Sequence, residues 1–345
     1  MAAPATTPPT TVLQPAPTVP SLVSPLVGEL EAAVASCLEP AAFFVSWQGV
    51  LTLAYTGFTQ PLINLKQRIT AAHSSLPPEN PGSKWPKTSL GSLRDGRRLT
   101  PDELALLCAI CTEESAAAFR QEPQQLQREQ QRHEQQALAG GSRTGSSATP
   151  PGVTVAGATA AGQAVAEAAA AAFGGAGEAD EATGIRLTVD FAAVVLFECR
   201  SLERLLSFQP VVFRGGFDAA PPRPGEVARV AAIVAEQDSP DYWYAASKDG
   251  HRESHYRGCH LGATLMHPLV LEPWVHEAGE GAGAAVGRAA ARPGQHRRGP
   301  RELADRQVLL AVISRFRERV DAALPGAYAW FSDASLHITL RALIN

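Results

Sequence analysis

The sequence has no apolar run of the roughly 18 residues needed to cross a bilayer. It also has no Lys or Arg before Lys66, so the basic stretch that opens a secretory signal is missing. We therefore expect an intracellular, cytoplasmic protein without a membrane partner; these absences leave an organelle address open. Residues 1–27, rich in Ala, Pro, Thr and Val, predict a disordered leader.

The cysteine content and the net charge argue against further classes of protein: disulfide-stapled domains, zinc-binding domains and strongly basic nucleic-acid binders. The five cysteines are scattered and odd in number, which is not typical of a disulfide framework. Cys108 and Cys111 have CxxC spacing, but they fall inside a predicted helix and no second Cys or His pair follows at a zinc-like distance. We interpret them as two half-buried helix cysteines, and we expect no metal and no cofactor. The net charge of −4 excludes a global basic field, so any contact with nucleic acid would be local.

Two internal segments are of low complexity. Residues 121–183 pass from a Gln/Glu/Arg tract into Gly, Ser and Ala, and residues 276–299 are rich in Ala, Gly and Arg. Such compositions bury too little apolar surface to offset chain entropy, so both predict disorder. The ordered parts are then residues 28–120, and residues 184–275 together with 300–345.

Residues 28–120 predict a strand at Val50–Tyr55, a helix from Gln60 onward and a short strand at Lys87–Leu93. A second helix begins after Thr100, which is placed as an N-cap, with Glu103 completing a capping box. Strands and helices in both ordered parts predict the α+β class.

The later part of the chain predicts further elements from the same periodicities. They are strands at Ala193–Cys199, Pro210–Phe213, His260–Leu271 and Ser335–Leu343, a helix at Leu303–Leu324, a helix or strand at Val227–Ala235, and a polar loop at Ser247–Gly258.

A short strand pattern, X-x-[ST]-Leu-x-x-Leu, occurs once in each ordered part. The first copy is Lys87-Thr-Ser-Leu-Gly-Ser-Leu and the second is His337-Ile-Thr-Leu-Arg-Ala-Leu. Residues i and i+2 of a strand point to the same face, so Lys87 projects with Ser89 and His337 projects with Thr339. The intervening apolar residues point into a core.

The His-Ile-Thr-Leu strand resembles the signature of the two-histidine phosphoesterase superfamily, which includes RNA 2′,3′-cyclic phosphodiesterases. The resemblance implies two pseudo-symmetric lobes of antiparallel sheet with helices on the outside, each offering one His-x-Thr/Ser strand to a central cleft. It covers about half of the chain and makes residues 28–120 the first lobe, and residues 184–275 with 300–345 the second. In the first motif Lys87 stands where the family has histidine. Family members usually continue beyond the second motif strand, so either the missing edge strand comes from elsewhere in the sequence or the gene product is truncated.

The resemblance implies that His337 is an acid or base and that Thr339 and Ser89 hold the phosphate. Lys87 is expected to anchor charge, because an ammonium with an ordinary pKa near 10.4 is a poor base at neutral pH. Burial that lowers this pKa would make Lys87 competent for proton transfer. The plainer alternatives are a solvated strand lysine and a packed strand histidine.

The segment before the last predicted strands is dense in polar side chains. Arg252, His255, Tyr256 and Arg257 suit a phosphate, and we assign them to substrate binding. His255 would be a replacement acid or base if this loop folds over the cleft. The aromatic run Tyr242–Tyr244 suits either base stacking or core packing.

The leading hypothesis is a metal-independent phosphodiesterase, a hydrolase acting on a cyclic nucleotide or an RNA-end phosphodiester. The first alternative is a catalytically degenerate module that binds a nucleotide or RNA end without turnover. A third is a scaffold whose low-complexity segments recruit partners; no motif points to a particular protein partner.

Overall fold

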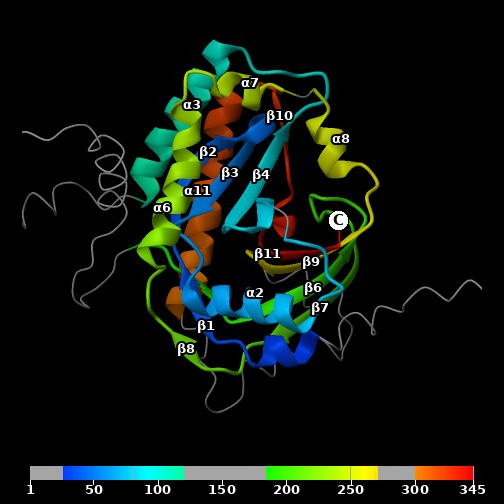
Figure 1. Cartoon of the computed structure of the whole chain (residues 1–345). Helices are drawn as coiled ribbons and strands as arrows, with labels where there is room; N and C mark the ends of the chain where they lie inside the picture. The colour runs from blue at the N-terminus through cyan, green and yellow to red at the C-terminus, as the bar shows by residue number, and fades with distance from the viewer. Residues whose placement is uncertain (1–25, 80, 120–183, 249, 271–299, 345) are drawn as a thin grey trace, which may run out of the picture.

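The computed structural model describes residues 26–79, 81–119, 184–248, 250–270 and 300–344 (Figure 1). The segments 121–183 and 276–299, for which the sequence predicts disorder, lie outside the described residues, as do residues 1–25. The predicted leader extends two residues too far, because Leu26 starts a helical turn and is buried in the core.

Two four-stranded antiparallel sheets dominate the fold, which confirms the α+β class. The first sheet has the strand order β10 (Tyr328–Trp330), β4 (Lys87–Leu93), β3 (Val50–Tyr55) and β2 (Pro40–Ser46). The second has the order β11 (His337–Ile344), β9 (Gly262–Pro268), β6 (Phe191–Phe197) and β7 (Leu205–Val212). A small third sheet joins β5 (Leu187–Val189), β1 (Ala35–Leu38) and β8 (Phe217–Asp218).

The longest helices, α3 (Pro101–Phe119) and α11 (Pro300–Ala323), lie together against the first sheet (Figure 1). The capping box at the start of α3 is confirmed: the Glu103 N–H donates to the Thr100 hydroxyl at 3.2 Å, and the Thr100 N–H donates to the Glu103 carboxylate at 2.9 Å. The rings of Phe43 on β2 and Phe316 on α11 stack at 4.2 Å between centroids, both almost fully buried. Burial of aromatic surface here fastens α11 to the sheet.

The other helices are shorter: α2 (Gln60–Ala72), α6 (Pro224–Ala235), α7 (Tyr242–Ala246) and α8 (Arg252–Arg257). Leu62, Leu65 and Ile69 of α2 belong to the main core, whereas Val230 of α6 packs on the opposite face of the first sheet beside Phe44. The 3₁₀ turns are η1 (Trp47–Gly49), η2 (Pro81–Ser83), η3 (Glu236–Asp238) and η4 (Asp333–Ser335).

The two sheets do not follow the two predicted halves of the chain. β10 comes from the range assigned to the second lobe, yet it pairs with β4 in the first sheet. α11 comes from the same range and packs on α3, while β1 from the first half pairs with β5 and β8 from the second. One main core includes residues of both halves. Elements of the two halves are therefore exchanged rather than segregated.

Several elements differ from the sequence-based prediction. The predicted loop Ser247–Gly258 contains the helix α8, so its loop assignment is wrong for those six residues. The predicted strand at Pro210–Phe213 is the second half of the longer β7, and Val227–Ala235 is helical. The strands β1, β2, β5, β8 and β10 and the helix α7 were not predicted.

Candidate active site

The two motif strands, β4 and β11, contact each other although they belong to different sheets. β10 pairs with residues 91–93 of β4, and no described strand pairs with the Lys87 end on this side. Beyond β10 the chain still follows β4, since the Phe331 N–H donates to the Leu90 carbonyl at 3.0 Å. The chain then turns through η4 and enters β11 at His337. Chain connection and packing thus place the second motif beside the first.

Burial alternates along both motifs as the repeat predicts. Thr88 and Leu90 on β4, and Ile338 and Leu340 on β11, are at most 1% exposed, and the three apolar ones belong to the same core. The residues between them are partly exposed: Lys87, Ser89, His337 and Thr339. Each strand therefore turns its two polar motif residues away from the shared core.

His337 is held in one tautomer by its own backbone neighbourhood. Its Nδ1 lies 2.7 Å from the carbonyl oxygen of Ser335, which can only accept, so Nδ1 carries the proton. Nε2 is then the basic nitrogen. Burial lowers the pKa of His337 below its ordinary value, and the hydrogen bond to Ser335 opposes this in part. A neutral imidazole with a lone pair on Nε2 has the properties of a general base near pH 7.

Lys87 is a desolvated cation. Burial lowers the pKa of its ammonium from 10.5 to about 8, with no charged group contributing to that change. The Nζ lies 4.6 Å from the centroid of the Trp85 ring, within cation–π range. Lys87 is therefore a partly exposed lysine whose ammonium is held against the Trp85 ring. Trp85, which supplies this contact, was missed in the sequence; its only signal is its place two residues before the motif.

Tyr256 reaches the first motif from α8. Burial raises the pKa of its phenol, and a hydrogen bond with the Ser89 side chain and the nearby guanidinium of Arg252 lower it in part. The Tyr256 ring packs against Phe331 at 4.9 Å. Arg252 is 6% exposed, whereas His255 is exposed. The structure thus brings Tyr256 to Ser89 and leaves His255 at the surface.

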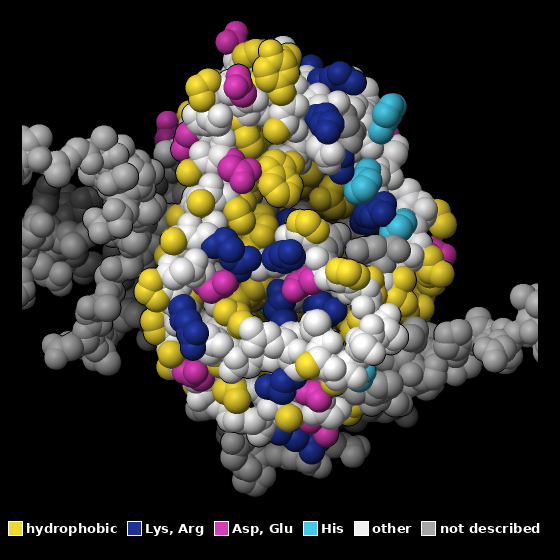
Figure 2. All heavy atoms as spheres, in the orientation of Figure 1, with side chains coloured by type: hydrophobic (Ala, Val, Ile, Leu, Met, Phe, Trp, Pro, Cys, Tyr) yellow, Lys and Arg dark blue, Asp and Glu magenta, His cyan; other side chains and the backbone are white. Residues whose placement is uncertain are grey.

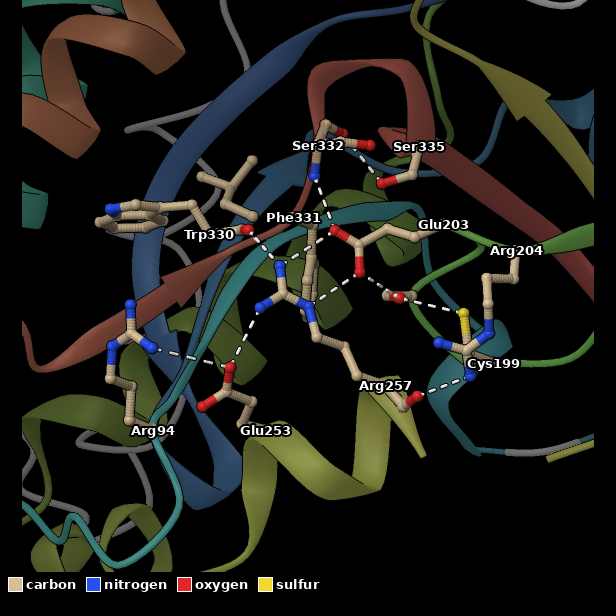
Figure 3. A network of polar contacts seen from close by, with 12 residues as sticks. Arg94, Cys199, Glu203, Arg204, Glu253, Arg257, Trp330, Phe331, Ser332 and Ser335 are labelled. Carbon is tan, nitrogen blue, oxygen red and sulfur yellow. Dashed lines mark hydrogen bonds and ion pairs between the residues drawn. The ribbon is translucent and has the colours of Figure 1, made fainter. Parts of the chain in front are cut away.

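Arg257 is engaged elsewhere (Figure 3). Its guanidinium donates to both carboxylate oxygens of Glu203 at 2.8 and 3.0 Å, to Glu253 at 3.0 Å and to the Trp330 carbonyl at 2.8 Å. Burial acts to raise the pKa of Glu203, but the hydrogen bonds from Arg257 and Ser201 bring it below its ordinary value. Arg257 therefore fastens α8 to the two sheets, and its assignment to substrate binding finds no support in this geometry.

The sequence also singled out the aromatic run Tyr242–Tyr244 and the CxxC pair Cys108 and Cys111, and among the described residues neither group forms a hydrogen bond with a motif residue. Tyr242 is buried and donates to the Val45 carbonyl at 2.8 Å, Trp243 donates to the Leu99 carbonyl at 2.7 Å, and Tyr244 is 68% exposed. Burial raises the pKa of Cys108 to about 11 and raises that of Cys111 well above its ordinary value, so neither thiol forms thiolate at neutral pH.

No known protein family, curated protein or solved structure matches this chain. Across the described ranges, no helix is long and apolar enough to span a membrane. No group of three or more His, Cys, Asp or Glu side chains within those ranges is arranged to hold a metal ion.

Proposed function

We propose that this protein is a metal-independent phosphodiesterase that opens a cyclic phosphate or an RNA-end phosphodiester between β4 and β11. The proposal rests on one observation: the adjacent strands turn Lys87 with Ser89, and His337 with Thr339, away from their common core. Those four residue types supply a base, an acid and two hydroxyl donors, which is the set that phosphodiester hydrolysis needs. The resemblance of His337–Leu340 to the two-histidine phosphoesterases agrees with it.

In the proposed reaction, Nε2 of His337 removes a proton from water as the water oxygen attacks phosphorus. The bond from phosphorus to the leaving oxygen breaks, and the ammonium of Lys87 donates a proton to that oxygen. A lysine with a pKa of about 8 is still mostly protonated at pH 7, yet it is acidic enough to transfer the proton. Thr339, Ser89 and the Tyr256 hydroxyl would donate to the phosphoryl oxygens. Each step uses a group of this chain.

The test is hydrolysis of the four nucleoside 2′,3′-cyclic phosphates in the presence of a chelator. We expect His337→Ala to lower kcat by about 10²-fold or more, which is typical for loss of a general base. His251→Ala, which removes an exposed histidine ahead of α8, is the matched control and should retain wild-type activity. Absence of turnover by the wild-type protein on every compound of the panel would refute catalysis.

The second candidate is a binding module that holds a nucleotide or RNA phosphate end without turnover. The lysine in the first motif favours it, because an ammonium is a better anion anchor than a proton acceptor. This reading expects salt-sensitive binding of a nucleoside 3′-monophosphate that Lys87→Ala weakens. Equal binding by the wild type and Lys87→Ala would remove this candidate as well.

A further inference from the structure

A pocket of about 440 Å³ lies between α2 and α6. Figure 2 shows a hollow near the middle of the view, rimmed by basic and acidic side chains. α2, which lines it, and η2, which ends just before the lining residue Lys84, both contact β11. Lys84 lines the pocket and stands three residues before Lys87 in the chain. The pocket therefore adjoins the segment that leads into the first motif strand.

The carboxylates of the pocket are already committed. Glu79 forms an ion pair with Lys66, with Nζ to Oε1 at 2.7 Å, and Glu226 is paired with Arg229. Lys66 is fully occupied, since it also donates to the Ser83 carbonyl at 2.6 Å and lies 4.1 Å from the centroid of the Phe58 ring. The negative charges of these two carboxylates are thus balanced by two cations of the pocket.

Two donors of the pocket remain available: the ammonium of Lys84, and the Nε–H of Arg229, whose terminal nitrogen is already paired with Glu226. Lys84 is exposed, and no carboxylate among the described residues lies within ion-pair distance of it. The Nε of Arg229 is buried and has no hydrogen-bond partner in the part of the chain that the structure describes. A buried N–H without an acceptor is costly, and an anion would satisfy it. The pocket therefore favours a ligand that brings hydrogen-bond acceptors and negative charge.

The pocket is larger than a phosphate alone. Its volume falls within the range of small-molecule sites, roughly 300–1,000 Å³, and Phe58 and Ile63 give it an apolar side. We propose that it binds a second phosphate-bearing group of the substrate, together with part of the sugar or base attached to it. This inference rests on the proposed function. It makes the preferred substrate a nucleotide with one phosphate in addition to the one that is opened.

The test compares adenosine 2′,3′-cyclic phosphate with the same compound carrying a 5′-phosphate. We expect the wild-type protein to have a KM about tenfold lower for the 5′-phosphorylated compound, the effect of about one charged hydrogen bond. Lys84→Gln should remove this preference and leave kcat/KM for the other compound unchanged. Lys248→Gln, at another exposed lysine, is the control and should keep it. Equal KM values for the two compounds in the wild type, or an equal loss on both in Lys84→Gln, would overturn the proposal.

A calorimetric titration with adenosine 5′-monophosphate separates this inference from the hydrolysis it rests on. If neither cyclic compound is turned over but the nucleotide binds and Lys84→Gln weakens binding about tenfold, the catalytic proposal fails and the pocket stands. If binding is absent, or is the same in Lys84→Gln, the pocket assignment fails.

Discussion

Replacing Lys87 with methionine should stabilise the folded protein at neutral pH. Burial lowers the pKa of the Lys87 ammonium from 10.5 to about 8, so the folded protein holds this charge less readily than the unfolded chain does. Methionine has a similar length and no charge, and it can keep the contact with the Trp85 ring. The substitution therefore removes the desolvation cost without leaving a cavity.

The size of the effect follows from two opposing contributions. A fall in pKa from 10.5 to about 8 corresponds to roughly 3 kcal/mol, since each pKa unit is worth about 1.4 kcal/mol. The cation–π contact at 4.6 Å from the Trp85 ring returns about 0.5–2 kcal/mol, which the neutral side chain loses. Desolvation is the larger of the two. We expect Lys87→Met to raise the free energy of unfolding by about 1–2 kcal/mol at pH 7.

The way in which the stability gain of Lys87→Met changes with pH distinguishes removal of a desolvated charge from simple repacking. The desolvation cost of the Lys87 charge is fully present below about pH 8, where Lys87 is charged in both the folded and the unfolded state. This cost disappears as the pH rises towards 10.5, where both states lose the proton. Urea denaturation of the wild type and Lys87→Met at about pH 7 and pH 10 measures the difference. Lys84→Met, at an exposed position three residues earlier, is the control and should change stability by less than about 0.5 kcal/mol. A destabilised Lys87→Met, or a gain of the same size at both pH values, would refute the reasoning.

Three further predictions concern catalysis and the fold. The rate of cyclic phosphate hydrolysis should fall on the acidic side of a pKa below 6.5, where His337 becomes protonated, and on the alkaline side of about pH 8, where Lys87 loses its proton. Lys87→Arg should abolish the fall in rate on the alkaline side. An unchanged alkaline fall in Lys87→Arg would show that Lys87 does not cause it. Thr100→Ala should cost about 1 kcal/mol by removing the N-cap of α3, measured by urea denaturation against Thr112→Ala in the middle of the helix, and equal losses would argue against a special role of the cap. Phe316→Ala should cost about 3–5 kcal/mol in the same assay, and a loss below about 1 kcal/mol would contradict its stacking on the sheet.

Local signals in the sequence were enough to find some of these elements. The strand at Val50–Tyr55 has the predicted bounds, and the capping box of Thr100 and Glu103 forms as its spacing indicates. The alternation along Lys87–Leu90 and His337–Leu340 also predicted which side chains leave the core. These features depend on residues only a few positions apart, which a sequence displays directly.

Other elements had no local signal. β2 is buried on both faces, so its sequence does not alternate, and β10 has only three residues. Residues 252–257 are all polar or charged apart from Tyr256, which is typical of a loop, yet α8 is held in place by the contacts of Arg257 with Glu203 and Trp330. Such partners lie more than fifty residues away in the chain, so local patterns could not predict them.

The exchange of elements between the halves has a consequence for how the chain folds as it is synthesised. Phe316 stacks on the ring of Phe43, and Tyr328 pairs with Leu93 at the end of β4. Part of the first (N-terminal) sheet therefore cannot form until segments more than two hundred residues later have been synthesised. Contacts of such long sequence separation form slowly, because a large loop must close before they are made. A nascent chain ending near residue 270 would expose this apolar surface and strand edge, and would be a ready target for chaperones. Emergence of residues 300–331 from the ribosome is then the event that completes the N-terminal sheet.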